Sequence, residues 1–166
     1  MYVLNQSDQK RILRSCELVF DDRQNWRKEY NEKESETIWV EYYPHSGMHG
    51  GGPVYLKEKE TESSIFVLAD KYLTSERDED WIGFVTDLSL TIDETEKLVA
   101  YMEERKEAYP IGALQILHDR IQINRGSLIG KHVSEIDQEV PKISELMNRI
   151  KNLQQLLPAD VRTSRG

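Results

Sequence analysis

The chain has 166 residues, a net charge of −8 and one cysteine, Cys16. This length fits one domain, or one domain with an appended helical subdomain. A single cysteine excludes an intramolecular disulfide and is typical of proteins in a reducing compartment. Because no apolar run approaches the ~20 residues of a membrane span and the N-terminus lacks a signal-peptide core, we expect a cytoplasmic protein without membrane contact.

The excess negative charge lies in the middle third of the chain. Residues 54–108 carry 15 acidic and 7 basic side chains. An acidic surface repels nucleic-acid phosphates, so it argues against direct nucleic-acid binding and favours a basic partner. Ordinary solubility is the alternative explanation for this charge.

The first half of the sequence predicts one helix and a small antiparallel sheet. Ser7 is a suitable N-cap, and apolar residues recur with helical spacing as far as Phe20, which predicts a helix over 7–20. We expect a helical turn or an irregular approach, and then a polar link, over 21–36. Alternation of β-branched and aromatic residues predicts a strand over 37–43, with an antiparallel partner over 54–59.

Two apolar runs farther along are interpreted as additional strands. Residues 63–69 end in five successive apolar residues, as in a strand buried on both faces, and residues 81–88 form a fourth candidate strand. The acidic segment 74–80 between them is interpreted as a solvated loop.

The second half predicts helices. Asp93 is expected to cap a helix, with Glu96 completing a box-like pattern, and Pro110 ends it. A largely apolar helix follows over 111–123, then a weaker helical stretch over 127–140, and Pro141 is suited to opening another helix. Apolar residues from Val140 to Leu157 recur at steps of three and four, which predicts a seam that packs on another helix of the same chain.

Together these patterns predict an α+β fold with an N-terminal helix, a small mainly antiparallel sheet and a C-terminal helical hairpin or bundle. We expect an α+β domain over 1–90, a helical subdomain over 91–158 and a flexible tail over 159–166. The seam is short for a coiled coil, so a monomer is expected rather than a homo-oligomer.

The segment between the first two predicted strands holds four of the nine glycines and two of the four histidines. Gly50, Gly51, Gly52 and Pro53 predict a shaped structural loop. Further ligands that would complete a metal site with His45 and His49 are missing, and so is the G-K-[ST] ending of a phosphate-binding loop. We therefore expect neither a metal nor a cofactor.

The string Tyr43-Pro44-His45-Ser46-Gly47-Met48-His49-Gly50-Gly51-Gly52-Pro53, with Trp39 before it and Leu56 after it, resembles the signature of one family of bacterial polymorphic-toxin immunity proteins. Arg11-Ile12 and Trp26 lie where that family places an arginine–isoleucine pair and a tryptophan. The resemblance covers roughly residues 8–73. It implies a protein that binds and neutralises a toxin encoded beside it.

Three functional hypotheses follow. The preferred one is an immunity protein, not an enzyme, that inhibits a cognate secreted toxin by stoichiometric binding; a basic nuclease domain would suit the acidic chain. The second is a small enzyme or ligand-binding protein that uses His45 and His49, although no nucleophile elbow, zinc motif or redox pair is present. The third is an assembly protein that oligomerises through the seam from Val140 to Leu157.

Tight protein interfaces usually combine aromatic anchors with charges around them. The candidate partner-binding residues chosen on this basis and from the loop are Trp39, Tyr43, His45, His49, Tyr55, Glu76, Asp78, Glu79 and Asp80. Sheet core is the alternative location for each of these aromatic residues.

Overall fold

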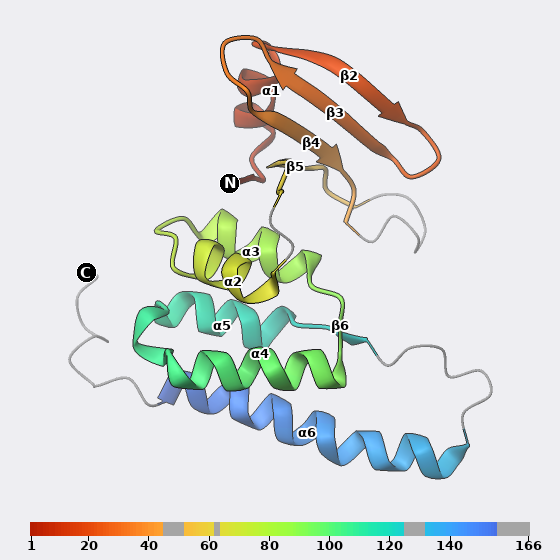
Figure 1. The fold of residues 1–166 in the computed structure, drawn as a ribbon, viewed down its shortest axis with the longest axis vertical. Coiled ribbons are helices and arrows are strands. Elements are labelled where there is room, and N and C mark those ends of the chain that lie inside the picture. The colour runs from red at the N-terminus through yellow and green to blue at the C-terminus, as the bar shows by residue number, and fades with distance from the viewer. Residues whose placement is uncertain (45–51, 62–63, 125–131, 156–166) are drawn as a thin grey trace.

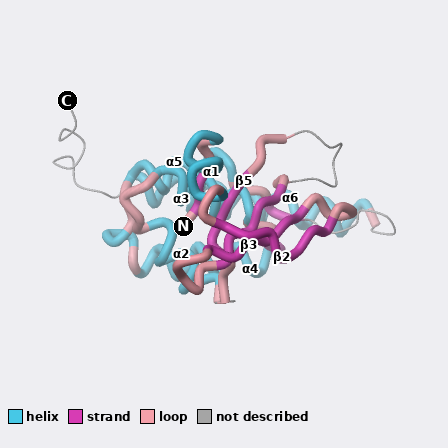
Figure 2. The backbone as a smooth tube through the Cα atoms, turned by 90° about the horizontal axis from the view of Figure 1, so that it is seen from above, coloured by secondary structure: helices cyan, strands magenta, loops and turns pink. Residues whose placement is uncertain are grey.

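The computed structural model describes residues 1–44, 52–61, 64–124 and 132–155, and these have the predicted α+β fold (Figure 1). An antiparallel sheet lies above a layer of helices, and seen from above its strands cross over that layer (Figure 2). The sheet has the strand order β1-β5-β4-β3-β2. Its strands are β1 (Tyr2–Val3), β2 (Cys16–Asp22), β3 (Arg27–Glu32), β4 (Ile38–Tyr42) and β5 (Tyr55–Glu58).

Helices make up most of the remaining described chain. They are α1 (Gln6–Leu13), α2 (Ile65–Leu73), α3 (Asp78–Asp87), α4 (Ile92–Glu104), the 3₁₀ turn η1 (Lys106–Ala108), α5 (Ile111–Arg120) and α6 (Val133–Gln155). A short parallel pair, β6 (Leu90–Thr91) and β7 (Ile123–Asn124), joins the start of α4 to the segment after α5. None of the described helices is long and apolar enough to cross a bilayer.

The two strands predicted around the glycine-rich loop are confirmed. They are β4 and β5, which pair antiparallel from Trp39 opposite Glu58 to Tyr42 opposite Tyr55. The alternation of residue types predicted these strands correctly because successive side chains of a strand point to opposite faces of the sheet.

The helix predicted over 7–20 is wrong in its second half. Helix α1 ends at Leu13, and residues from Cys16 onward form β2, which pairs with β3. The N-cap is Asn5 rather than Ser7, because the Asn5 side chain accepts hydrogen bonds from the backbone N–H groups of Ser7 and Asp8. Strand β3 also replaces the helical turn or irregular link expected over 21–36. Residues 16–22 and 27–32 are strands because they pair with each other across the hairpin, and this pairing is not visible in the local periodicity of either segment.

The strands predicted over 63–69 and 81–88 are also wrong, because both segments are helical. In α2 the buried residues are Ala69, Tyr72 and Leu73, which share one helical face. Helix α3 begins at Asp78, inside the predicted acidic loop, with three acids in its first turn. Negative charge is favourable there because the N-terminal end of a helix carries a partial positive charge.

The helix predicted between Asp93 and Pro110 and the one predicted over 111–123 are present, with shifted ends. The two helices predicted on either side of Pro141 are one helix, α6, while residues 127–131 and 156–157 of those predictions lie outside the described part of the chain. Thr91, not Asp93, caps α4, and Glu94 completes a capping box with it. Pro141 lies inside α6 instead of opening it. The predicted seam packs inside the chain through Leu146, Ile150 and Leu153, while Val140 stays exposed.

Two apolar clusters hold the described chain together. Val3, Trp39 and Leu56 form the smaller one on the face of the sheet that α1 covers. The larger one joins helices α2 to α6 and includes Tyr2 from the sheet. The helices α2 and α3 thus share a core with α4 to α6. The expected boundary at residue 90 stays a prediction, and so does the tail over 159–166, which lies outside the described residues.

Candidate partner-binding surface

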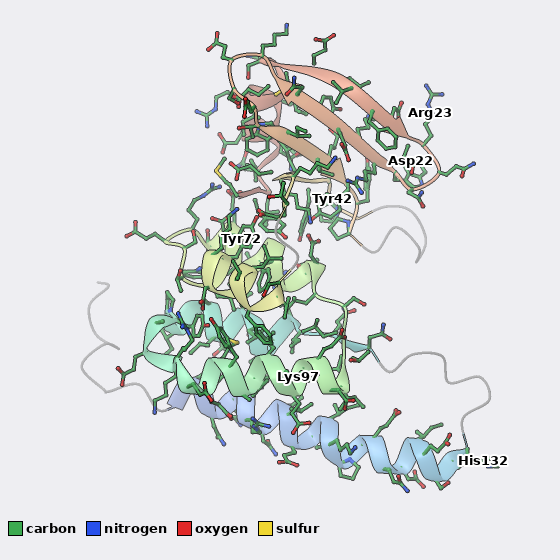
Figure 3. All side chains as sticks on the ribbon, viewed as in Figure 1. Asp22, Arg23, Tyr42, Tyr72, Lys97 and His132 are labelled. Carbon is green, nitrogen blue, oxygen red and sulfur yellow. The ribbon has the colours of Figure 1, made fainter. Side chains whose placement is uncertain are left out.

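The tip of the β2–β3 hairpin presents an aromatic side chain on a tight, well-bonded turn. Asp22 ends β2, and its carboxylate accepts hydrogen bonds from the backbone N–H groups of Gln24 and Asn25, both at 3.1 Å. The Asn25 side chain also donates to it at 2.7 Å, and this bond lowers the pKa of the Asp22 carboxyl. Asp22 and Arg23 lie at the turn end of the hairpin (Figure 3).

The residue that closes this turn, Trp26, has an unusual backbone conformation. Its φ of 52° is the only positive value outside glycine in the described residues. A bulky L-residue rarely adopts this region, at a cost on the order of 1 kcal/mol or more. The side chain is 56% exposed, so burial of the ring in the core does not offset the strain.

The Trp26 ring is held by one aromatic neighbour. Tyr43, just after β4, meets it edge-on, with the ring centroids 5.8 Å apart and the planes at 75°. The two rings border a cavity of about 430 Å³ whose other lining residues are Asp21, Asp22, Arg23, Arg27, Lys28 and Glu41.

Charges of both signs line this cavity, three acids and three bases. The Lys28 ammonium donates to Glu41 at 3.2 Å, and this bond raises the pKa of Lys28. The cavity therefore offers paired charges around an aromatic centre and no net charge of its own. Such a mixture is typical of a protein-binding surface, in which Trp and Tyr are over-represented among the residues that dominate affinity.

The predicted aromatic contacts occupy different environments. Tyr43 is half-buried beside Trp26, whereas Trp39, 3% exposed, packs with Val3 and Leu56. Tyr55 is buried as well and meets Tyr42 edge-on. Among these aromatics, the structure brings only Tyr43 to the hairpin tip; partner binding by Trp39 and Tyr55 stays a prediction.

The four predicted acids separate into an exposed pair and a bonded pair. Glu76 and Asp78 are exposed. Glu79 accepts hydrogen bonds from the backbone N–H groups of Leu4 and Asn5, both at 3.0 Å, and the buried Asp80 accepts one from Tyr2 N–H at 2.6 Å. Glu79 and Asp80 thus hold the first strand, and the role of all four in partner binding stays a prediction.

The loop predicted to present histidines falls largely outside the described residues. This applies to His45, His49, Gly50 and Gly51, whose expected roles stay predictions. Gly52 and Pro53 are described and are exposed just before β5. In the described part of the chain, no group of three or more His, Cys, Asp or Glu side chains is arranged to hold a metal ion.

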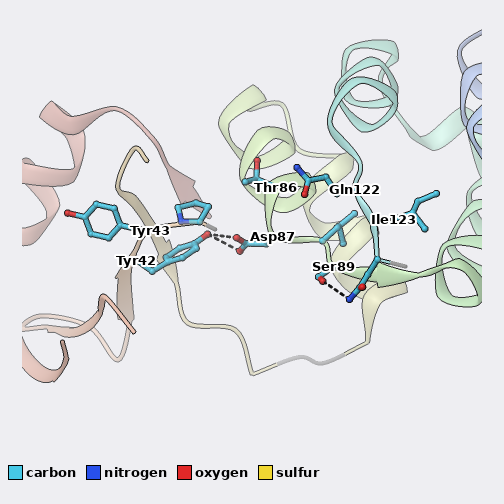
Figure 4. A pocket seen from close by; sticks show the side chains of 10 residues that line it. Tyr42, Tyr43, Thr86, Asp87, Ser89, Gln122 and Ile123 are labelled. Carbon is cyan, nitrogen blue, oxygen red and sulfur yellow. Dashed lines mark hydrogen bonds between the residues drawn. The ribbon is translucent and has the colours of Figure 1, made fainter. Parts of the chain in front are cut away.

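A second hollow, of about 570 Å³, lies between the end of β4 and the segment after α3 (Figure 4). At its side the Asp87 carboxylate accepts hydrogen bonds from Tyr2 at 2.8 Å, from Tyr42 at 2.7 and 2.8 Å, and from Lys57 at 2.5 Å. Burial, and then the nearby Asp87 charge, raise the pKa values of both tyrosines, so the phenols stay protonated donors. These contacts join the sheet to α3, which makes this group of residues a structural joint.

The partner-binding residues predicted from the sequence include neither Trp26 nor Arg23. The signal that could have found the tip is the run Asp22-Arg23-Gln24-Asn25, which is rich in turn-forming residues and lies between two stretches able to pair as strands. The helix predicted over 7–20 hid that hairpin.

Comparison with known proteins gives one match. Residues 5–58 match the model of a family described as Immunity protein 27. Searches of curated proteins and of solved structures gave no match. The matched segment begins at the N-cap of α1, ends with β5 and contains the whole hairpin that carries Trp26. The match therefore confirms the predicted resemblance to an immunity-protein family over the part of the chain that builds α1 and strands β2 to β5.

Proposed function

We propose that this protein is an immunity protein that neutralises a cognate secreted toxin by stoichiometric binding, without turnover. It acts as a monomer in the cytoplasm of the cell that makes the toxin. The observation that carries the proposal is the exposed, strained Trp26 within the segment that matches the immunity-protein family.

The strain at Trp26 supports a binding role because folding alone does not favour it. Glycine would adopt a φ of 52° without the steric cost. A mostly exposed indole contributes little to the core, and its contact with Tyr43 is worth only about 0.5–1.5 kcal/mol. A rigid aromatic side chain on a hydrogen-bonded turn is well suited to enter a pocket of a partner, because little conformational entropy remains to be lost.

The charge of the chain adds a preference for a basic toxin, and a basic nuclease domain would fit it. Glu76 and Asp78 are exposed acids that can speed the encounter with a cationic partner. Reversing both charges should slow association at low salt and leave the dissociation rate nearly unchanged. An association rate that does not change would remove charge steering from the proposal.

The test uses the C-terminal domain of the large secreted protein encoded in the neighbouring reading frame. Expression of that domain alone should arrest growth, co-expression with this protein should restore it, and the two chains should co-purify in a fixed ratio. Absence of such a reading frame, or growth arrest that persists with this protein present, would refute the proposed function.

A matched pair of variants then locates the anchor. Trp26→Gly removes the ring and relieves the strain, so we expect stability within about 1 kcal/mol of wild type and binding weakened about tenfold or more. Val133→Ala, at an exposed apolar side chain of α6, should change neither quantity. If Trp26→Gly binds the toxin domain as tightly as wild type, the anchor lies elsewhere.

A further inference from the structure

Strand β2 is the outermost strand of the sheet, and its middle is apolar and exposed. Within the described part of the chain it pairs with β3 alone. Leu18, Val19 and Phe20 are 49%, 57% and 49% exposed, and Glu17 and Asp21 on either side are exposed too. A strand that only covers a core buries alternate residues, whereas here five in succession face solvent.

At the opposite edge of the sheet, side chains bond the backbone groups of β1. The N–H of Tyr2 in β1 donates to Asp80, and its carbonyl accepts from the Arg77 guanidinium at 2.8 Å. Glu79 satisfies the next N–H groups, those of Leu4 and Asn5. Side chains from the start of α3 therefore seal the β1 edge, as proteins commonly seal strands that would otherwise pair with other chains.

The β2 edge has one protective feature, and it leaves the apolar residues exposed. The register with β3 shifts between Leu18 and Phe20, so Val19 forms a bulge without a partner residue on β3. Bulges discourage edge pairing, but an apolar triplet between acids is also what a complementary strand could recognise.

The acids that flank the triplet decide which kind of strand fits. A second copy that paired all three apolar residues antiparallel would centre on Val19 and place Glu17 of each copy opposite Asp21 of the other. Like charges directly opposite one another are destabilising. A strand with an apolar centre and lysine or arginine at the flanking positions would meet opposite charges instead.

We propose that the β2 edge is where the partner adds a strand to this sheet, through backbone hydrogen bonds along residues 17–21 and apolar contacts with Leu18, Val19 and Phe20. The partner strand has an apolar centre with basic residues on both sides. This inference rests on the proposed function, which supplies the partner, a toxin domain. It is continuous with the Trp26 surface, since β2 leads directly into the turn that carries Trp26. Addition of a strand to an exposed edge is a recurrent mode of protein recognition.

The first test is amide hydrogen exchange of the whole wild-type chain, alone and mixed with the toxin domain from the neighbouring reading frame. We expect slower exchange in a segment that covers residues 17–21. This measurement needs no substitution, so it does not depend on whether a variant folds.

The second test compares two substitutions of the same type. Val19→Asp places a charge in the triplet at the position that pairs with nothing on β3, whereas Val67→Asp does so at an equally open site on α2, 50% exposed. We expect Val19→Asp to weaken binding about tenfold or more and Val67→Asp to leave it unchanged. Thermal melting of both variants confirms that they fold. Glu17→Lys combined with Asp21→Lys should weaken binding most at low salt.

The outcomes separate this inference from the proposed function. A complex that forms without protection of 17–21 and with Val19→Asp binding like wild type overturns the edge-strand inference and leaves the function standing. No complex with the wild-type chain overturns both. Sedimentation at two concentrations tests for self-association of the wild-type chain. If the chain self-associates and Val19→Asp abolishes this, the occupant of the edge is a second copy, and the inference is also overturned.

Discussion

Removing the Asp87 carboxylate should destabilise the contact between the sheet and α3. In Asp87→Ala the phenols of Tyr2 and Tyr42 lose their acceptor, and Tyr2 is buried. A buried donor left without a partner costs about 1–3 kcal/mol. The Lys57 ammonium is 25% exposed and can turn to water, so it adds least. We therefore expect Asp87→Ala to lower the free energy of unfolding by about 2–5 kcal/mol, a large part of the ~5–15 kcal/mol typical of a folded domain.

Urea unfolding followed by tryptophan fluorescence measures this loss, and Asp137→Ala provides the control because Asp137 is an exposed carboxylate on α6. The control should stay within about 0.5 kcal/mol of wild type. A double-mutant cycle makes the reasoning specific. Tyr42→Phe should destabilise the wild-type chain by about 1 kcal/mol and should be neutral or stabilising when Asp87 is already alanine, because it then removes an unsatisfied hydroxyl.

Two results would refute this account of Asp87. One is a loss below about 1 kcal/mol for Asp87→Ala, which would mean that water replaces the carboxylate at both phenols. The other is an equal effect of Tyr42→Phe in both backgrounds, which would mean that the hydroxyl and the carboxylate do not act on each other.

Three further predictions use the same unfolding assay. Gly83→Ala would bring a Cβ within 2.1 Å of the Tyr2 ring and should cost about 1–3 kcal/mol or more, whereas Gly112→Ala, with its closest contact at 2.9 Å, should cost less; equal losses would contradict the tight fit of Tyr2. Thr91→Ala removes the capping box of α4 and should cost about 0.5–2 kcal/mol; no loss would mean that the cap is not formed. Burial raises the pKa values of Tyr2 and Tyr42 in the folded chain, so the unfolded chain loses those protons first and stability falls as pH rises through about 10, by about 1.4 kcal/mol per pH unit for each phenol. Tyr42→Phe should make that fall less steep, and an unchanged slope would contradict it.

Predictions from sequence were correct where a local pattern and the final environment agreed. Strand β4 alternates between two buried faces, and α4 and α5 carry their apolar residues on one side. In α6 the seam predicts which residues become buried, Leu146, Ile150 and Leu153. In these elements the periodicity reflects the packing directly, so no knowledge of distant contacts was needed.

The wrong predictions come from short apolar runs, whose period is ambiguous. Residues 65–68 are Ile-Phe-Val-Leu, a strand-forming composition, yet the helical face is completed only by Ala69, Tyr72 and Leu73 beyond that run. Residues 12–20 show helical spacing, but Cys16 to Phe20 lie in β2, which pairs with β3. Whether such a run becomes helix or strand depends on which distant segment it meets, and that information is not local.

The candidate surface was hidden from sequence for the same reason. The helix predicted over 7–20 includes Val19 and Phe20, and their exposure follows only from the position of β2 at the sheet edge. Glu76, Asp78, Glu79 and Asp80 stay predicted partner-binding residues, and two of them, Glu79 and Asp80, also hold the first strand. Composition located the charged and aromatic residues, whereas their neighbours in space determined what each can contact.

The two edges of the sheet show how the helices and the family segment depend on one another. The segment that matches the immunity-protein family, residues 5–58, includes β5 but not β1. Strand β1 pairs with β5 on one side and meets α3 on the other, while Tyr2 enters the helical core. The helices thus close one edge of the sheet and leave β2 open. Because an exposed apolar edge favours unwanted pairing, an edge left open beside one that is sealed argues for a use of β2 in recognition, not for a general tolerance of open edges in this fold.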